Sequence, residues 1–131
     1  MRDRTLWTWH IGTGLVILVL LGLHMMVMHL DDSLGIFNPA GGHPIEWQNV
    51  LARMQSTFFT VTYVLLLGAA LFHGLYGLRN ILLELNPPRW LRSAVNVLSV
   101  LGGVALFSYG TWAAVAAQSL AGTLVAAGGA R

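Results

Sequence analysis

The chain has 131 residues, of which 56% are hydrophobic and 9% are charged, and its mean hydropathy is +0.68. Soluble domains carry roughly 25% charged residues, so this composition excludes an ordinary soluble domain. The net charge is +2, and all the basic residues are arginines. Because these arginines are scattered and form no basic stripe, the sequence does not indicate a nucleic-acid-binding protein. The absence of cysteine excludes disulfides, thiolate ligands and iron–sulfur clusters held by this chain.

Three long apolar segments account for the high hydropathy, at about 7–28, 57–83 and 95–117. Each is near or above the ~20 residues that cross a ~30 Å hydrocarbon core as a helix, and each run is continuous rather than alternating. The first run is longer than the core of a signal peptide and no small-x-small cleavage site follows it, so we expect a retained helix. We therefore predict an all-α membrane protein, a single domain over 1–131 with three transmembrane helices. The expected helices span about 7–29, 57–84 and 93–118.

The charges on the two connections predict an orientation. The outer loop, 30–56, carries more acidic than basic residues, whereas arginines gather before the first helix and around the 84–94 turn. The positive-inside rule then places the N-terminus and the 84–94 turn in the cytoplasm.

The second half of the outer loop, "IEWQNVLARMQ", has apolar residues near helical spacing. This pattern predicts a short helix in the membrane interface, with Trp47 at headgroup level and Asn49 and Arg53 mostly on the opposite side.

The sequence indicates where the second helix ends and how the third helix packs. Pro87 and Pro88 end the second helix, because the residue before a proline avoids the helical conformation. The third helix is rich in glycine and alanine, which allow close approach of other helices. The tail "AGTLVAAGGAR" is expected to fray. Because three helices with intramembrane histidines make a thin bundle, we expect partner chains.

His73 is the first candidate for chemistry. It lies about 24 Å into the second helix, where a neutral imidazole still needs partners for its ring nitrogens. Its neighbours on the same face, Ala69, Ala70 and Gly77, are small and leave a groove beside the ring. A flat macrocycle needs such a groove when a histidine ligates its iron. A histidine that hydrogen-bonds a neighbouring helix is an equal alternative at this point.

Two charged residues follow on the same helix. Arg79 can snorkel to the inner interface and reach a carboxylate, such as a propionate of a haem held by His73. Glu84 lies eleven residues beyond His73, about 16 Å along the helix. Taken alone, Glu84 is best interpreted as a solvated residue at a helix end.

The first helix carries His10 and His24, which are fourteen residues and about 21 Å apart and lie nearly on one face. This arrangement is found in four-helix cytochromes with two haems. His29 is interpreted as a boundary residue, and no function is assigned to His43. No two histidines are spaced i, i+3 or i, i+4, which disfavours a compact zinc or copper site.

The stretch "HGLYGLRNILLE", from His73 to Glu84, resembles the second-helix signature H-x-x-x-G-x-R-x-x-x-x-D of the succinate dehydrogenase and fumarate reductase membrane anchors. Glutamate stands here for the aspartate of the signature. The stretch "WHIGTG", Trp9 to Gly14, is a weaker match to the family's H-R-x-[ST]-G, with Ile11 in place of the arginine.

This resemblance implies roles for individual residues. His73 would be an axial ligand of haem b, Arg79 would neighbour the haem propionates, and Glu84 would lie near the quinone site. Trp9 and His10 would belong to the same cytoplasmic quinone pocket. His24, in the outer half of its helix, would ligate a second haem, so that one or two haems are shared with a partner chain.

The resemblance thus predicts a haem b-binding membrane anchor subunit of a succinate:quinone or quinol:fumarate oxidoreductase. The expected cofactors are haem b and a quinone, either menaquinone or ubiquinone. The expected partners are a flavoprotein subunit, an iron–sulfur subunit, a second membrane anchor subunit and the lipid of a bacterial or archaeal cytoplasmic membrane. Two alternatives stay open: the haem-bearing membrane subunit of another quinone-linked redox complex, and a haem-free structural anchor.

Overall fold

A computed structural model describes residues 2–34, 43 and 45–128, and within these residues all regular structure is helical. The helices follow each other along the chain as α1 (Arg2–Leu34), α2 (Trp47–Gln55), α3 (Thr57–Glu84) and α4 (Arg89–Gly128). Among the described residues, three segments are long and apolar enough to cross a membrane: Arg4–His29, Thr57–Glu84 and Arg89–Leu124. The predicted all-α fold with three membrane helices is confirmed.

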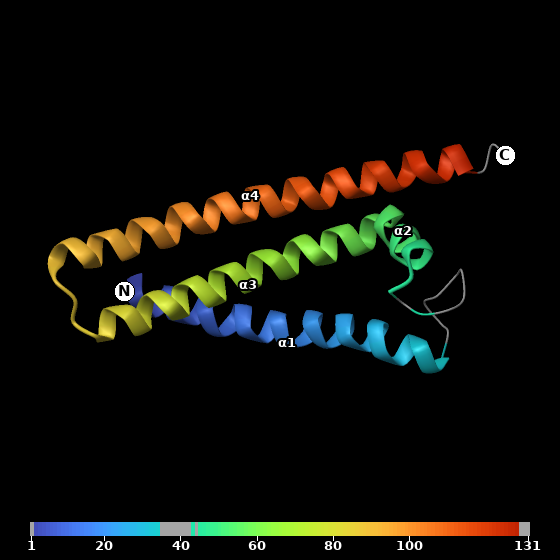
Figure 1. The fold of residues 1–131 in the computed structure, drawn as a ribbon. Helices are drawn as coiled ribbons and strands as arrows, with labels where there is room; N and C mark the ends of the chain where they lie inside the picture. The colour runs from blue at the N-terminus through green and yellow to red at the C-terminus, as the bar shows by residue number, and fades with distance from the viewer. Residues whose placement is uncertain (1, 35–42, 44, 129–131) are drawn as a thin grey trace.

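The central helix of the bundle is α3, which packs on α1 along one side and on α4 along the other (Figure 1). In the described part of the chain α1 and α4 do not pack on each other. The N-terminus of α1 and the α3–α4 turn lie at one end of the bundle, which we call the turn end. The C-terminus of α1 and helix α2 lie at the opposite end, which we call the loop end.

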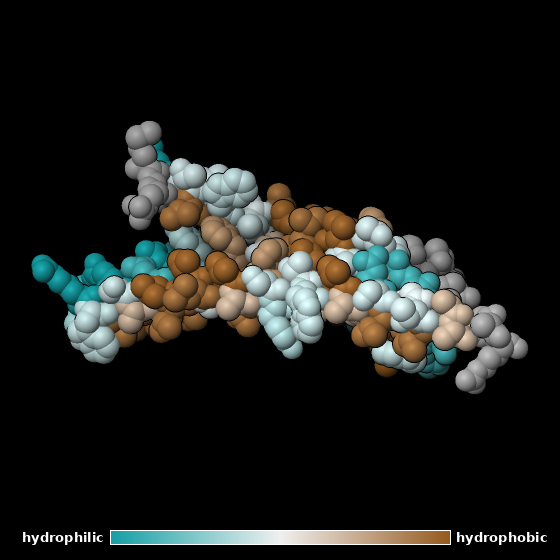
Figure 2. Space-filling model, turned by 90° about the horizontal axis from the view of Figure 1, so that it is seen from above, coloured by the Kyte–Doolittle hydropathy of each residue, from teal (hydrophilic) through white to brown (hydrophobic). Residues whose placement is uncertain are grey.

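The outside of the bundle is apolar and its interior is small. Large hydrophobic side chains such as Leu18 and Leu98 are 71% and 68% exposed, whereas the buried hydrophobic residues are only Leu51, Ala69 and Ala121 among those described. Figure 2 shows hydrophobic side chains over much of the bundle and hydrophilic ones toward both of its ends. This distribution suits a chain whose surroundings are lipid or other apolar helices rather than water.

Two helices are longer than predicted. The first begins at Arg2 and ends at Leu34 instead of spanning 7–29, and the third spans Arg89–Gly128 instead of 93–118. The expectation that the whole tail frays is wrong up to Gly128, and residues 129–131 lie outside the described residues. The tail is rich in alanine, a strong helix former, and Ala121 is fully buried.

The α3–α4 turn begins with a residue in the left-handed region, Asn86, with a φ of 51°. Asparagine is one of the few residues that adopt this conformation just after a helix, where it turns the chain away from the helix axis. Pro87 and Pro88 follow, and the backbone N–H of Arg92 donates to the Pro88 carbonyl at 3.0 Å as α4 starts. The prediction that the prolines separate the two helices is confirmed.

Helix α2 packs against the loop ends of α3 and α4. The predicted short helix is present, and Trp47 is 61% exposed, but Asn49 and Arg53 on the opposite side are buried in the protein. The Asn49 side chain donates to the His43 carbonyl at 3.1 Å. Asn49 and Arg53 are therefore internal, as is Leu51 of the predicted apolar side, and whether the exposed apolar residues of α2 rest on a membrane stays a prediction. The rest of the outer loop, residues 35–42 and 44, lies outside the described residues.

Candidate functional site

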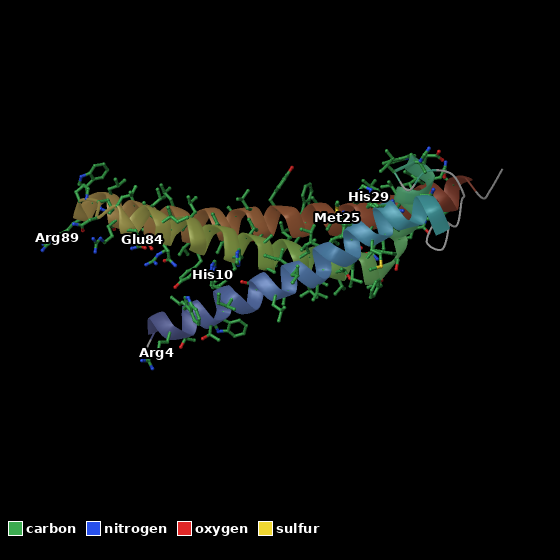
Figure 3. The ribbon with its side chains drawn as sticks, turned by 90° about the horizontal axis from the view of Figure 1, so that it is seen from below. Arg4, His10, Met25, His29, Glu84 and Arg89 are labelled. Carbon is green, nitrogen blue, oxygen red and sulfur yellow. The ribbon has the colours of Figure 1, made fainter. Side chains whose placement is uncertain are left out.

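The main site residues of α1 and α3 meet directly. The imidazole rings of His10 and His73 are stacked, with their centroids 4.1 Å apart and their planes 9° from parallel. The ring of Tyr76, which also lies on α3, flanks the His10 ring at a centroid distance of 5.2 Å. Figure 3 shows His10 on the part of α1 that is closer to the turn end, where Arg4, Glu84 and Arg89 are labelled.

A hydrogen bond holds the His73 ring in place. The ring nitrogen Nδ1 lies 3.0 Å from the backbone carbonyl oxygen of His10. Because a carbonyl oxygen only accepts, this contact assigns a proton to Nδ1, and in the neutral ring Nε2 then keeps its lone pair. A histidine whose Nδ1–H donates to a carbonyl is the form that ligates a metal through Nε2.

Two glycines make the close approach of α1 and α3 possible. A Cβ on Gly14 of α1 would lie 3.0 Å from Cε1 of His73, and a Cβ on Gly77 of α3 would lie 3.3 Å from Cε1 of His10. Each histidine thus lies against a glycine of the opposite helix, and each of these glycines is four residues beyond the histidine of its own helix. The two helices present the same His-x-x-x-Gly pattern to each other in antiparallel directions.

His24 lies at a different level of the same helix pair. Its ring meets the ring of Tyr63 edge-on, at a centroid distance of 5.6 Å. It is half-buried, and neither of its ring nitrogens is hydrogen-bonded to another described residue. At 1.5 Å per residue it stands about 21 Å from His10 along α1, toward the loop end. The structure therefore places His24 and His73 at two separate positions.

Arg79 faces α4 rather than α1. Its Nε donates to Oδ1 of Asn96 at 2.7 Å, and its Nη1 donates to Oδ1 of the adjacent Asn80 at 3.0 Å. Both partners are neutral amides, and no carboxylate among the described residues pairs with this guanidinium. The structure does not bring Arg79 into contact with His73.

A groove of about 700 Å³ runs between α3 and α4 beside Arg79. Its walls are mostly apolar, and its polar lining includes Arg79, Asn96 and Ser99 toward the turn end. His73 does not line it. Arg79 and the stacked histidines thus face different neighbours of α3, with Tyr76 lining the groove and also flanking His10.

The remaining predicted site residues lie on the surface of the chain. Trp9 is 64% exposed, and Glu84 is exposed at the last residue of α3. In the described structure no hydrogen bond or ring contact joins either of them to His10. The three residues expected to share a quinone pocket are therefore close to the turn end but are not assembled into one pocket by this chain. His29, labelled in Figure 3, is exposed at the loop end.

His10 and His73 are predicted from the sequence to belong to different sites, and their contact is not predicted. The recurring His-x-x-x-Gly pattern, at 10–14 and again at 73–77, was the available signal. The described residues hold no group of three or more His, Asp or Glu side chains that could bind a bare metal ion.

Comparison with known proteins agrees with this architecture, which is that of a small helical membrane subunit. The family described as "Succinate dehydrogenase/Fumarate reductase transmembrane subunit" matches residues 2–105. A "Succinate dehydrogenase hydrophobic membrane anchor subunit" from Archaeoglobus fulgidus is 30% identical over 106 residues, which cover 81% of this chain and 83% of that protein. No solved structure gives a significant match.

The chain therefore belongs to the family of succinate dehydrogenase and fumarate reductase transmembrane subunits. The resemblance identified in the sequence is confirmed at the level of the family. The family assignment makes the chain a membrane anchor of such a complex.

Proposed function

We propose that this chain is a haem b-binding anchor subunit of a succinate:quinone or quinol:fumarate oxidoreductase in a bacterial or archaeal cytoplasmic membrane. It would dock the flavoprotein and iron–sulfur subunits, pair with a second membrane anchor and form part of the site for menaquinone or ubiquinone. The observation that carries the haem proposal is the hydrogen bond from Nδ1 of His73 to the His10 carbonyl.

The residues around His73 fit an axial ligand of haem. The ring is half-buried in an apolar bundle, its proton is held on Nδ1, and Nε2 is left as a lone-pair donor. A haem b bound there would take up and release one electron at a time. A further ligand of the iron would come from a helix of the second anchor subunit.

Two further residues are proposed contacts of the haem. Arg79 holds a positive charge about 9 Å further along α3 than His73, and it has amide partners rather than a carboxylate. It would attract an anionic propionate. His24 is a half-buried imidazole at a separate level, which supports the proposal of a second haem nearer the loop end.

The quinone site is proposed at the turn end, with contributions from His10, Trp9 and Glu84. Because these residues do not form a closed pocket in this chain, the docked subunits would complete it. His10 and Glu84 would donate or accept hydrogen bonds at the quinone oxygens and exchange protons with them.

The direct test is a reduced-minus-oxidised visible spectrum of the complex purified in mild detergent, with haem quantified per copy of this chain. The set includes the wild type, His73→Ala, His24→Ala and, as a matched control, His29→Ala, which changes an exposed histidine of α1. We expect His73→Ala to lose haem and His29→Ala to keep it. Loss of one of two haems in His24→Ala would support the second site, and a wild type without haem would leave a structural anchor.

A further inference from the structure

The His10 carbonyl is exposed toward α3 because residue 14 is glycine. In an α-helix the side chain at position i+4 leans back over the carbonyl of position i, since every Cα–Cβ bond is tilted toward the N-terminus. A Cβ on Gly14 would lie 3.2 Å from Nδ1 of His73 and 3.0 Å from its Cε1. Without that carbon, Nδ1 reaches the His10 oxygen at 3.0 Å.

The same residue that supplies the carbonyl also supplies the stacked ring. The His10 imidazole lies parallel to that of His73 at 4.1 Å, and Gly77 leaves room for it on α3. The backbone of His10 therefore fixes one edge of the His73 ring, and its side chain covers one face. Rotation of the His73 ring about its χ2 angle is opposed by both contacts.

We infer that His10 and Gly14 are positioning residues that set the orientation and the ligand strength of His73 toward haem iron. This inference rests on the proposed ligation of haem by His73, and it assigns His10 a role beyond the expected quinone contact. A hydrogen bond from Nδ1–H to a carbonyl makes the imidazole a stronger electron donor through Nε2. A stronger donor favours the ferric state, so the intact contact holds the midpoint potential of the haem down.

The glycines of α1 provide a matched pair of variants. Gly14→Ala places a methyl group against the His73 ring, which must move by a few tenths of an ångström, whereas a Cβ on Gly12 has no atom within 4 Å. In the complex purified from membranes, we expect Gly14→Ala to retain haem and to shift its midpoint potential to a more positive value. The low-spin electron paramagnetic resonance signal should change its largest g-value. Gly12→Ala should match the wild type in both measurements.

A second pair of variants tests the stacked ring without introducing a clash. His10→Ala keeps the backbone carbonyl but removes the ring that covers His73, so the largest-g signal should become broader as the ligand ring samples more orientations. His10→Phe restores a flat ring without nitrogen atoms and should narrow the signal again. If Gly14→Ala does not assemble, this pair decides the question.

The outcomes separate this inference from the proposed function. If His73→Ala keeps its full haem content, the ligand assignment itself fails. If His73→Ala loses haem while Gly14→Ala has the potential and the signal of Gly12→Ala, the ligand stands and the positioning role is overturned. A wild-type line width in His10→Ala would also overturn the role of the ring.

Discussion

His73 and Arg79 lie six residues apart on α3 but face different neighbours. The His73 ring contacts His10 of α1, whereas the Arg79 guanidinium donates to Asn96 of α4. Six residues correspond to about 240° of rotation around a helix, which accounts for the difference. One face of α3 would therefore hold the iron ligand, and another face holds the positive charge.

Because of this separation, Arg79 would act on a haem through its charge rather than as a ligand of the iron. The midpoint potential of the haem measures this effect. Replacing Arg79 with glutamine removes a positive charge and keeps a side chain that can donate to Asn96. Because a nearby cation favours the reduced haem, we expect the midpoint potential to become more negative, opposite in sign to the effect of Gly14→Ala. Arg92→Gln, at an exposed position beside the turn, is the control and should leave the potential unchanged. An unchanged potential in Arg79→Gln would remove Arg79 from the haem environment.

Close packing of α3 on α4 predicts a second effect, on stability. A Cβ on Gly103 would lie 3.0 Å from Cδ1 of Leu75, whereas a Cβ on the adjacent Gly102 has open space around it. Valine at 103 requires the Leu75 side chain to shift, and we expect a loss of about 1–3 kcal/mol in the free energy of unfolding. Gly102→Val carries the same helix propensity and serves as the control. Thermal unfolding in detergent measures the stability of both variants. Equal melting temperatures for Gly103→Val and Gly102→Val would contradict the close contact.

The helices themselves could be predicted because lipid exposure leaves a continuous apolar run in the sequence. Their ends were harder to predict, because the tail after Ala117 is only weakly apolar and its helical state depends on contacts with α2. Gln55 and Gln118 lie more than sixty residues apart in the sequence, and no local pattern shows that they meet. The longer C-terminal end of α4 has this origin.

The candidate site was predicted residue by residue but not as an arrangement. His73 could be singled out because histidine is costly in a membrane helix unless it has a partner. That this partner is the carbonyl of His10 depends on the register between α1 and α3. The contacts of Gly14 with His73 and of His24 with Tyr63 follow one antiparallel register, which side-chain packing sets. In the sequence, only the repeated His-x-x-x-Gly pattern indicates this register.

At the loop end, the side chains of Gln55 and Gln118 form hydrogen bonds that connect α4 to α2 and α3. The Gln118 amide donates to the Gln55 carbonyl at 3.4 Å and to the Thr57 hydroxyl at 3.2 Å, and the Gln55 amide donates to the Ala121 carbonyl at 3.3 Å. Replacing Gln118 with leucine removes two of these bonds, at a cost of about 0.5–1.5 kcal/mol each. We expect faster amide hydrogen exchange in α2 and in the last turns of α4. Ser119→Ala, which changes only a local bond to the Ala116 carbonyl, should not alter the exchange.

The orientation of the chain in the membrane is open to a direct experiment because the sequence has no cysteine. Gln48 of α2 and Ser93 of α4 are both exposed and lie at opposite ends of the bundle, so a single cysteine at either position reports on one side. The arginines near the N-terminus and the α3–α4 turn predict that the turn end is cytoplasmic. In intact cells a membrane-impermeant thiol reagent should therefore label Gln48→Cys, and it should label Ser93→Cys only after the membrane is solubilised in denaturing detergent. The reverse pattern would place the turn end outside, and with it the proposed docking surface and quinone site, where subunits held in the cytoplasm could not reach them.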